Sequence, residues 1–300
     1  SFFSGFNEFI IAEICVGIGG SLMSGSDTAL LYDTLIEENE QKTYTRVEGK
    51  NYAIGNFSES IAGIVGGLLA VNHLYLPVYL QTIILFFSIP ISLSLIEPKA
   101  NKKLALSFQS IKNVLYFSLI KNLKLKWLII FSSFMGVATL SIAWLAQPFF
   151  QEINIPILYF GLLWALLNLT AGISSFNSHK FSSKSNIFKY SIIMIVSFIL
   201  LSLYQSLVGL IFIFIIYAIR GLVTPLLKNL ININISSEKR ATILSIRSFI
   251  IRISFATLAP FLGLIADKKS LQYSFFILTV IIIITLCLSC FKLYKLDKKK

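Results

Sequence analysis

Ionisable side chains inside long apolar segments are the residues of this sequence with the clearest chemical potential. They are Glu13, Asp27, Glu59, Arg220 and Arg252, and Asp33 follows just beyond the first segment. A charge near the centre of a bilayer costs about 3 kcal/mol on insertion scales, so such residues mark solute paths, proton relays or ion pairs. Glu13 is a candidate carrier of a coupling proton, because loss of water favours the protonated carboxyl group. The alternative for Glu13 is a hydrogen-bonded packing role.

Arg220 belongs to a polar stripe on one predicted helix. Tyr217, Arg220, Thr224 and Lys228 recur at spacings of three or four residues, which puts them on one helical face. We expect this face to line water or a solute. The alternative is a buried ion pair between Arg220 and Glu59, or another acid, that keeps two helices in register. The two roles can coexist.

A second set of charges lies nearer the predicted cytoplasmic ends of the segments. We expect a gate there, formed by Asp27, Asp33, Glu59 and Arg252. Charge pairs at a gate hold one conformation closed and break when it opens.

These side chains must be positioned by membrane-spanning helices. Of the 300 residues, 56% are hydrophobic and only 13% are charged, whereas soluble domains are about 25% charged. Apolar runs of about 20 residues, enough to cross a bilayer, occupy nine segments: 6–30, 52–72, 77–96, 127–149, 156–176, 189–206, 207–229, 244–266 and 271–293. The runs lack the two-residue alternation of a membrane barrel. The predicted fold class is all-α, a polytopic transmembrane helical bundle.

The distribution of basic residues predicts the orientation of these helices. Seven lysines and no acid lie between Pro98 and Trp127, and further basic residues follow every second segment. Because such loops stay inside the cell, we expect a multi-pass protein of the cell membrane with a cytoplasmic C-terminus. The net charge of +12 is spread over several loops, which indicates contact with anionic inner-leaflet lipid and argues against nucleic acid as a partner.

The basic connection at 98–126 carries its own periodic pattern. Leu104, Phe108, Ile111, Leu115 and Leu119 recur at helical spacing, with lysines on the other side. This pattern predicts an amphipathic helix on the membrane surface.

Two stretches carry a resemblance to a known family. They are SGSDTALLYDTL (24–35), followed by RVEGKNYAIGNFSESIAGIVGGLLA (46–70), and RGLVTPLLKNLIN (220–232), followed by EKRATILSIRSFIIRI and GLIAD. The first resembles helices four and five of bacterial major facilitator superfamily transporters, and the second resembles helices ten and eleven. The family's twelve-helix plan implies that the nine segments are helices four to twelve of a chain whose first three helices are missing.

The resemblance also implies a domain plan and a solute path. Residues 1–97 would be the remainder of the N-terminal bundle, 98–126 the cytoplasmic linker and 127–300 the six-helix C-terminal bundle. Since the family places helices four, seven and ten around a central cavity, Glu13, Arg220 and, from the seventh helix, Thr139, Trp144 and Gln147 would lie near the path. The further candidate path residues are Asn168, Tyr217 and Thr224. Trp144 has a second reading as an aromatic residue of the membrane interface.

These observations favour a secondary active transporter over other membrane proteins. We expect alternating access for a small solute, driven by a proton or substrate gradient, with proton-coupled efflux as one mode. The sequence contains no phosphate loop, nucleophile elbow or zinc pair, so we expect no enzymatic activity, no cofactor and no metal. A membrane-embedded enzyme and a non-transporting scaffold or receptor are the alternatives.

Overall fold

The computed structural model describes residues 6–73, 75–96, 98, 108–181 and 184–298, and these residues are helical throughout with short turns and no strand. Eight helical stretches in this part of the chain are long and apolar enough to cross a membrane. The predicted all-α, membrane-embedded class is therefore confirmed. The segment predicted at 189–206 is also helical, but its apolar part, Ile187–Leu203, is shorter than the others.

Six long helices in the second half of the chain share one core. They are α7 (Leu123–Glu152), α8 (Phe160–Phe176), α9 (Lys184–Leu203), α10 (Leu207–Asn232), α11 (Ser237–Lys268) and α12 (Leu271–Asp297). Their contacts bury large side chains such as Phe131, Phe149, Phe198 and Phe275 almost completely. In a bilayer, close packing rather than removal of apolar surface from water holds such helices together.

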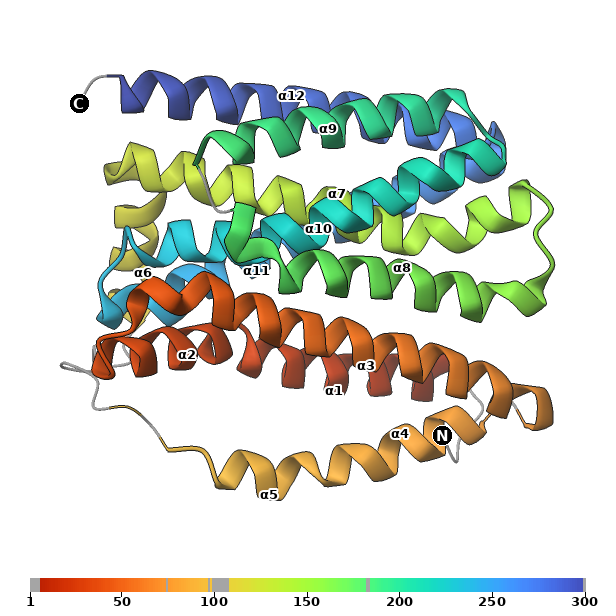
Figure 1. The fold of residues 1–300 in the computed structure, drawn as a ribbon, viewed down its shortest axis with the longest axis horizontal. Coiled ribbons are helices and arrows are strands. Elements are labelled where there is room, and N and C mark those ends of the chain that lie inside the picture. The colour runs from red at the N-terminus through yellow and green to blue at the C-terminus, as the bar shows by residue number, and fades with distance from the viewer. Residues whose placement is uncertain (1–5, 74, 97, 99–107, 182–183, 299–300) are drawn as a thin grey trace.

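The helices of the first half of the chain contact this core with fewer of their faces than the six core helices contact one another (Figure 1). It contains α1 (Phe6–Met23), α2 (Ser26–Glu37), α3 (Tyr44–Asn72), α4 (Leu76–Phe86) and α5 (Ser88–Leu93). Helix α3 runs along α8 and α10, α2 contacts α11, and α4 contacts α3. Most side chains of α1, α4 and α5 are exposed and apolar, as suits a helix that faces lipid.

The first predicted segment, 6–30, is a broken helix rather than a continuous one. The chain turns at Gly25, whose φ of 82° lies in the left-handed region that glycine adopts without strain. A Cβ atom at Gly25 would lie 2.6 Å from the carbonyl oxygen of Ala241 on α11. The break therefore serves a close approach of α1 and α2 to α11.

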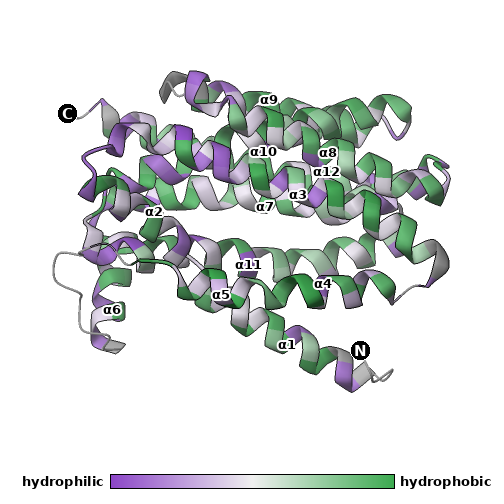
Figure 2. Ribbon diagram, turned by 60° about the horizontal axis from the view of Figure 1, so that its bottom comes forward, coloured by the Kyte–Doolittle hydropathy of each residue, from purple (hydrophilic) through white to green (hydrophobic). Residues whose placement is uncertain are grey.

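Hydrophilic residues gather at one end of the bundle (Figure 2). The C-terminus, α6 (Phe108–Tyr116) and the α2–α3, α8–α9 and α10–α11 connections lie at the left end in Figure 1, and we call this the basic end. The α3–α4, α7–α8, α9–α10 and α11–α12 connections lie at the other end. The basic connections that alternate along the sequence therefore lie together at one end of the bundle.

The described part of the linker, from residue 108 onward, contains a helix that carries part of the predicted amphipathic pattern. Helix α6 is followed by a π-helical turn, Phe117–Lys121, and Leu104 lies outside the described residues. Val114 is buried, whereas Ile111 and Leu115 are exposed together with Lys112. Helix α6 contacts α11, so it is tied to the bundle through Val114 and keeps two apolar side chains available for a membrane surface.

Close contact between α8 and α10 depends on the absence of a side chain at Gly221. A Cβ atom there would overlap the backbone carbonyl of Ala171 and lie 3.0 Å from the Cβ atom of Ser174. We therefore expect Gly221→Val to lower the free energy of unfolding by about 1–3 kcal/mol, measured by titration with sodium dodecyl sulfate in mixed micelles. Gly67→Val is the matched control, because a Cβ atom at Gly67 meets nothing within 4 Å. Equal losses in both variants would contradict the close contact.

Candidate functional site

A row of polar contacts joins α3 to α10 across the bundle. Tyr52 accepts a hydrogen bond from Arg220 Nε at 2.8 Å, Glu48 pairs with Lys228 Nζ at 2.6 Å, and Thr45 accepts from Asn229 Nδ2 at 2.8 Å. We call these six residues the polar seam. It lies between the first-half helices and the second-half helices, and it runs inward from the basic end.

The register of the seam follows from helical geometry. Thr45, Glu48 and Tyr52 are three and four residues apart, so they share one face of α3. Arg220 and Lys228 are eight residues apart and share a face of α10. Because the two helices run in opposite directions, the higher-numbered residue of α3 meets the lower-numbered residue of α10.

Burial makes the contacts of the seam important for stability. The side chain of Glu48 is 2% exposed and that of Lys228 is 18% exposed, so neither charge is well hydrated. Charges removed from water are stable only when they are paired and hydrogen-bonded. The Glu48–Lys228 pair therefore couples the two groups of helices strongly while they are together.

A second charged contact joins α2 to α11 at the basic end. Arg240 forms a hydrogen-bonded ion pair with Asp33, and the Ser237 hydroxyl donates to the same carboxylate at 2.8 Å. The guanidinium of Arg240 also lies 4.3 Å from the ring centre of Tyr32, at cation–π distance. Asp33 was predicted as a gate residue, and the structure gives it Arg240 rather than Arg252 as its partner.

Two cavities lie beside the seam. The larger cavity has a volume of about 330 Å³, and it is lined by Gly20, Met23, Ser24, Gly25, Asp27, Thr28, Lys228, Leu244, Arg247, Ser248 and Arg252. The smaller cavity, of about 20 Å³, is lined by Met135, Gly136, Thr139, Met194, Arg220, Val223, Thr224, Leu227 and Arg247. Arg247 lines both cavities.

Arg247 is a buried cation whose side-chain hydrogen bonds go to neutral groups. It is 9% exposed, and its Nε donates to the Ser132 hydroxyl at 2.5 Å. Its second contact, at 3.5 Å, is with the Ser132 carbonyl. Within the described part of the chain, no carboxylate forms an ion pair with Arg247.

The structure brings several predicted residues together. Thr139, Arg220 and Thr224 line the smaller cavity, and Asp27 and Arg252 line the larger one. Tyr217 is completely buried, and its ring lies 5.3 Å from the guanidinium of Arg220.

Other predicted residues lie apart from the two cavities. Glu13 is exposed on α1, and Trp144 and Gln147 are exposed on α7. Glu59 is exposed on α3, and among the described side chains Tyr52, not Glu59, hydrogen-bonds Arg220. Asn168 is fully buried in α8 and donates to the Trp164 carbonyl at 3.1 Å.

Six residues of the charged and hydrogen-bonded contacts escaped the sequence analysis: Thr45, Glu48, Tyr52, Asn229, Arg240 and Arg247. Thr45 and Glu48 precede the predicted segment 52–72 and Tyr52 is its first residue, yet α3 already begins at Tyr44. Arg240 lies outside the predicted segment 244–266 and Arg247 lies inside it, and both are buried in α11. The available signal was their helical spacing of seven residues, which puts them on one face.

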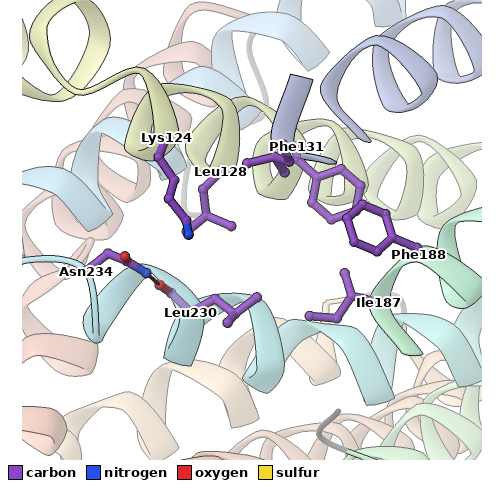
Figure 3. Close-up of a pocket in the computed structure, with 8 residues that line it drawn as sticks. Lys124, Leu128, Phe131, Ile187, Phe188, Leu230 and Asn234 are labelled. Carbon is purple, nitrogen blue, oxygen red and sulfur yellow. Dashed lines mark hydrogen bonds between the residues drawn. The ribbon is translucent and has the colours of Figure 1, made fainter. Parts of the chain in front are cut away.

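A further cavity, of about 60 Å³, lies inside the second-half helices near the basic end (Figure 3). Its lining comes from α7, α9, α10 and α12 and is mostly apolar: Lys124, Leu128, Phe131, Ile187, Phe188, Leu230, Asn234 and Leu293. None of the six seam residues lines it, so it is not part of the seam.

Comparison with known proteins adds no assignment to this geometry. The sequence matches no protein-family model and no curated protein.

Proposed function

We propose that this chain belongs to a secondary active transporter that moves a small solute across the cell membrane by alternating access. The observation that carries the proposal is the polar seam with the larger cavity, both placed between two groups of otherwise apolar helices. Polar and charged residues inside a membrane are costly, and a structural role alone would be served as well by apolar packing. If the seam opens and takes up water during transport, its residues must be polar.

The contacts of the seam are of the kind that can break and re-form. Hydrogen bonds and ion pairs such as Glu48–Lys228 and Asp33–Arg240 exchange readily for water when a cavity opens. The close packing within the second-half helices favours their movement as a rigid body. Loss of the contacts at the basic end would expose the larger cavity from that side.

We further propose that the transporter is of the major facilitator type, with the basic end in the cytoplasm. Both stretches that resemble the family border the same cavity: residues 24–35 contribute Asp27 and Thr28, and residues 220–253 contribute Lys228, Arg247 and Arg252. The positive charge of the basic end supports its cytoplasmic placement.

A cross-link across the seam tests the proposal. Thr45 and Asn229 are replaced by cysteine in a background where Cys15, Cys287 and Cys290 are serine, and the protein is reconstituted in vesicles loaded with a mixture of small metabolites. Solutes lost from the vesicles are identified by mass spectrometry. We expect oxidation to abolish this loss and a reductant to restore it, because alternating access requires α3 and α10 to separate.

A matched cross-link checks that the disulfide itself is harmless. Ser202 and Gln272 are also in contact, through a 3.1 Å hydrogen bond from Gln272 to the Ser202 carbonyl, but both lie in the second-half helices. Ser202→Cys with Gln272→Cys should leave flux unchanged after oxidation. Undiminished flux with the α3–α10 cross-link would refute alternating access at this seam, and vesicles that release no solute would refute transport.

A further inference from the structure

We propose that the larger cavity binds the anionic group of a small solute, a carboxylate or a phosphate. This inference rests on the proposed function, since it assigns a substrate class to the same site. It starts from the charges of the residues that line the cavity and from Arg247, a buried cation that forms no ion pair among the described residues.

The lining of the larger cavity is positively charged. Among the lining residues, the cations are Lys228, Arg247 and Arg252, and the only acid is Asp27. Glu48, the ion-pair partner of Lys228, adds a second carboxylate. The larger cavity therefore has three cations and two carboxylates, one positive charge in excess, and a cationic solute would meet repulsion there.

Arg247 makes this excess significant. An arginine side chain stays protonated in proteins, so Arg247 cannot remove its charge by releasing a proton. Its observed partners are the hydroxyl and the carbonyl of Ser132, which are neutral. A buried cation of this kind is stabilised by an anion that enters the adjoining cavity.

Arg252 and three hydroxyl residues give the larger cavity further groups that can bind an anion. The guanidinium nitrogens of Arg252 lie 3.5 Å from where a Cβ atom of Gly20 would be, and Nη2 is 3.4 Å from the Gly20 carbonyl. Ser24, Thr28 and Ser248 add hydroxyl groups to the lining. A volume of about 330 Å³ equals that of about ten water molecules, which suits a small metabolite.

Thermal unfolding of the purified full chain in detergent tests this assignment. Sodium succinate and inorganic phosphate are the anionic probes, and choline chloride and erythritol are the cationic and neutral ones, all at ionic strength matched with sodium chloride. We expect succinate, phosphate or both to raise the melting temperature in a saturable manner, and choline and erythritol to leave it unchanged. The response to each anion separates a carboxylate site from a phosphate site.

Three variants locate the effect. Arg247→Gln and Arg252→Gln should raise the half-saturating anion concentration at least tenfold, and Arg46→Gln should not, because Arg46 is an exposed arginine of α3 outside the cavity. If Arg247→Gln does not fold, the exposed Arg252 still provides the test. Stabilisation by choline, or equal anion responses in Arg252→Gln and Arg46→Gln, would overturn the inference.

This test can fail independently of the transport test. Vesicles that release only neutral or cationic solutes through an uncross-linked seam would refute the anion site and support transport. Saturable anion binding in a protein that moves no solute would refute transport and support the anion site.

Discussion

Replacing Lys228 by alanine is expected to lower the free energy of unfolding by about 3–5 kcal/mol. The reason is the environment of its partner: Glu48 is 1% exposed as a residue, and its carboxylate is 2.6 Å from Lys228 Nζ. Without the ammonium group, Glu48 must either remain ionised in a buried place or take up a proton, and both cost free energy. Titration with sodium dodecyl sulfate in mixed micelles, followed by circular dichroism, measures the loss.

Two further variants distinguish a broken pair from a general effect of losing a lysine. Lys50→Ala removes an exposed lysine from α3 and should change stability by less than about 0.5 kcal/mol. Glu48→Gln combined with Lys228→Met removes both charges and keeps most of the volume, so it should recover most of the loss. A double variant as unstable as Lys228→Ala would show that the buried pair is not the cause.

The positions of the membrane helices could be predicted because hydropathy reports them directly. Segments such as 127–149 and 271–293 lie inside α7 and α12. Charge placement likewise predicted which connections share an end of the bundle. Both signals are local in sequence, and neither requires knowledge of which helices touch.

The partners at the seam could not be predicted, because they depend on contacts between distant segments. Residues 44–51 are too polar for a hydropathy window, yet they are helical because Thr45 and Glu48 meet Asn229 and Lys228 on α10. Arg247 was missed although it lies inside the predicted segment 244–266, because the sequence does not show that the packing of α11 on α7 buries it against Ser132.

The break between α1 and α2 was missed for a conformational reason. A run of glycine and apolar residues reads as one continuous segment, whereas the positive φ of Gly25 is set by the proximity of α11. This break gives the larger cavity much of its wall, since Met23, Ser24, Gly25, Asp27 and Thr28 line it. The stripe on α10 was correctly placed on one face, but the residues opposite it came only from the structure.

Asp33→Asn is expected to raise the population of the form in which the larger cavity is open at the basic end by at least about tenfold. The Asp33 carboxylate is the anionic partner of Arg240, whose side chain is only 3% exposed, and asparagine keeps the shape but removes the charge. Breaking a buried pair costs several kcal/mol, and a shift of 1.4 kcal/mol already changes a conformational equilibrium tenfold. The closed arrangement of α2 on α11 should therefore lose population to an open one.

A single cysteine in place of Thr28 reports this opening. Thr28 is 3% exposed and lines the larger cavity, so in the closed form a membrane-impermeant maleimide should react slowly, in a background where Cys15, Cys287 and Cys290 are serine. Asp33→Asn should accelerate labelling from the basic end. Glu38→Gln, which removes an exposed acid just after α2, should not. Because labelling follows the open population, equal rates in the two variants would mean that the Asp33–Arg240 pair does not hold the seam closed.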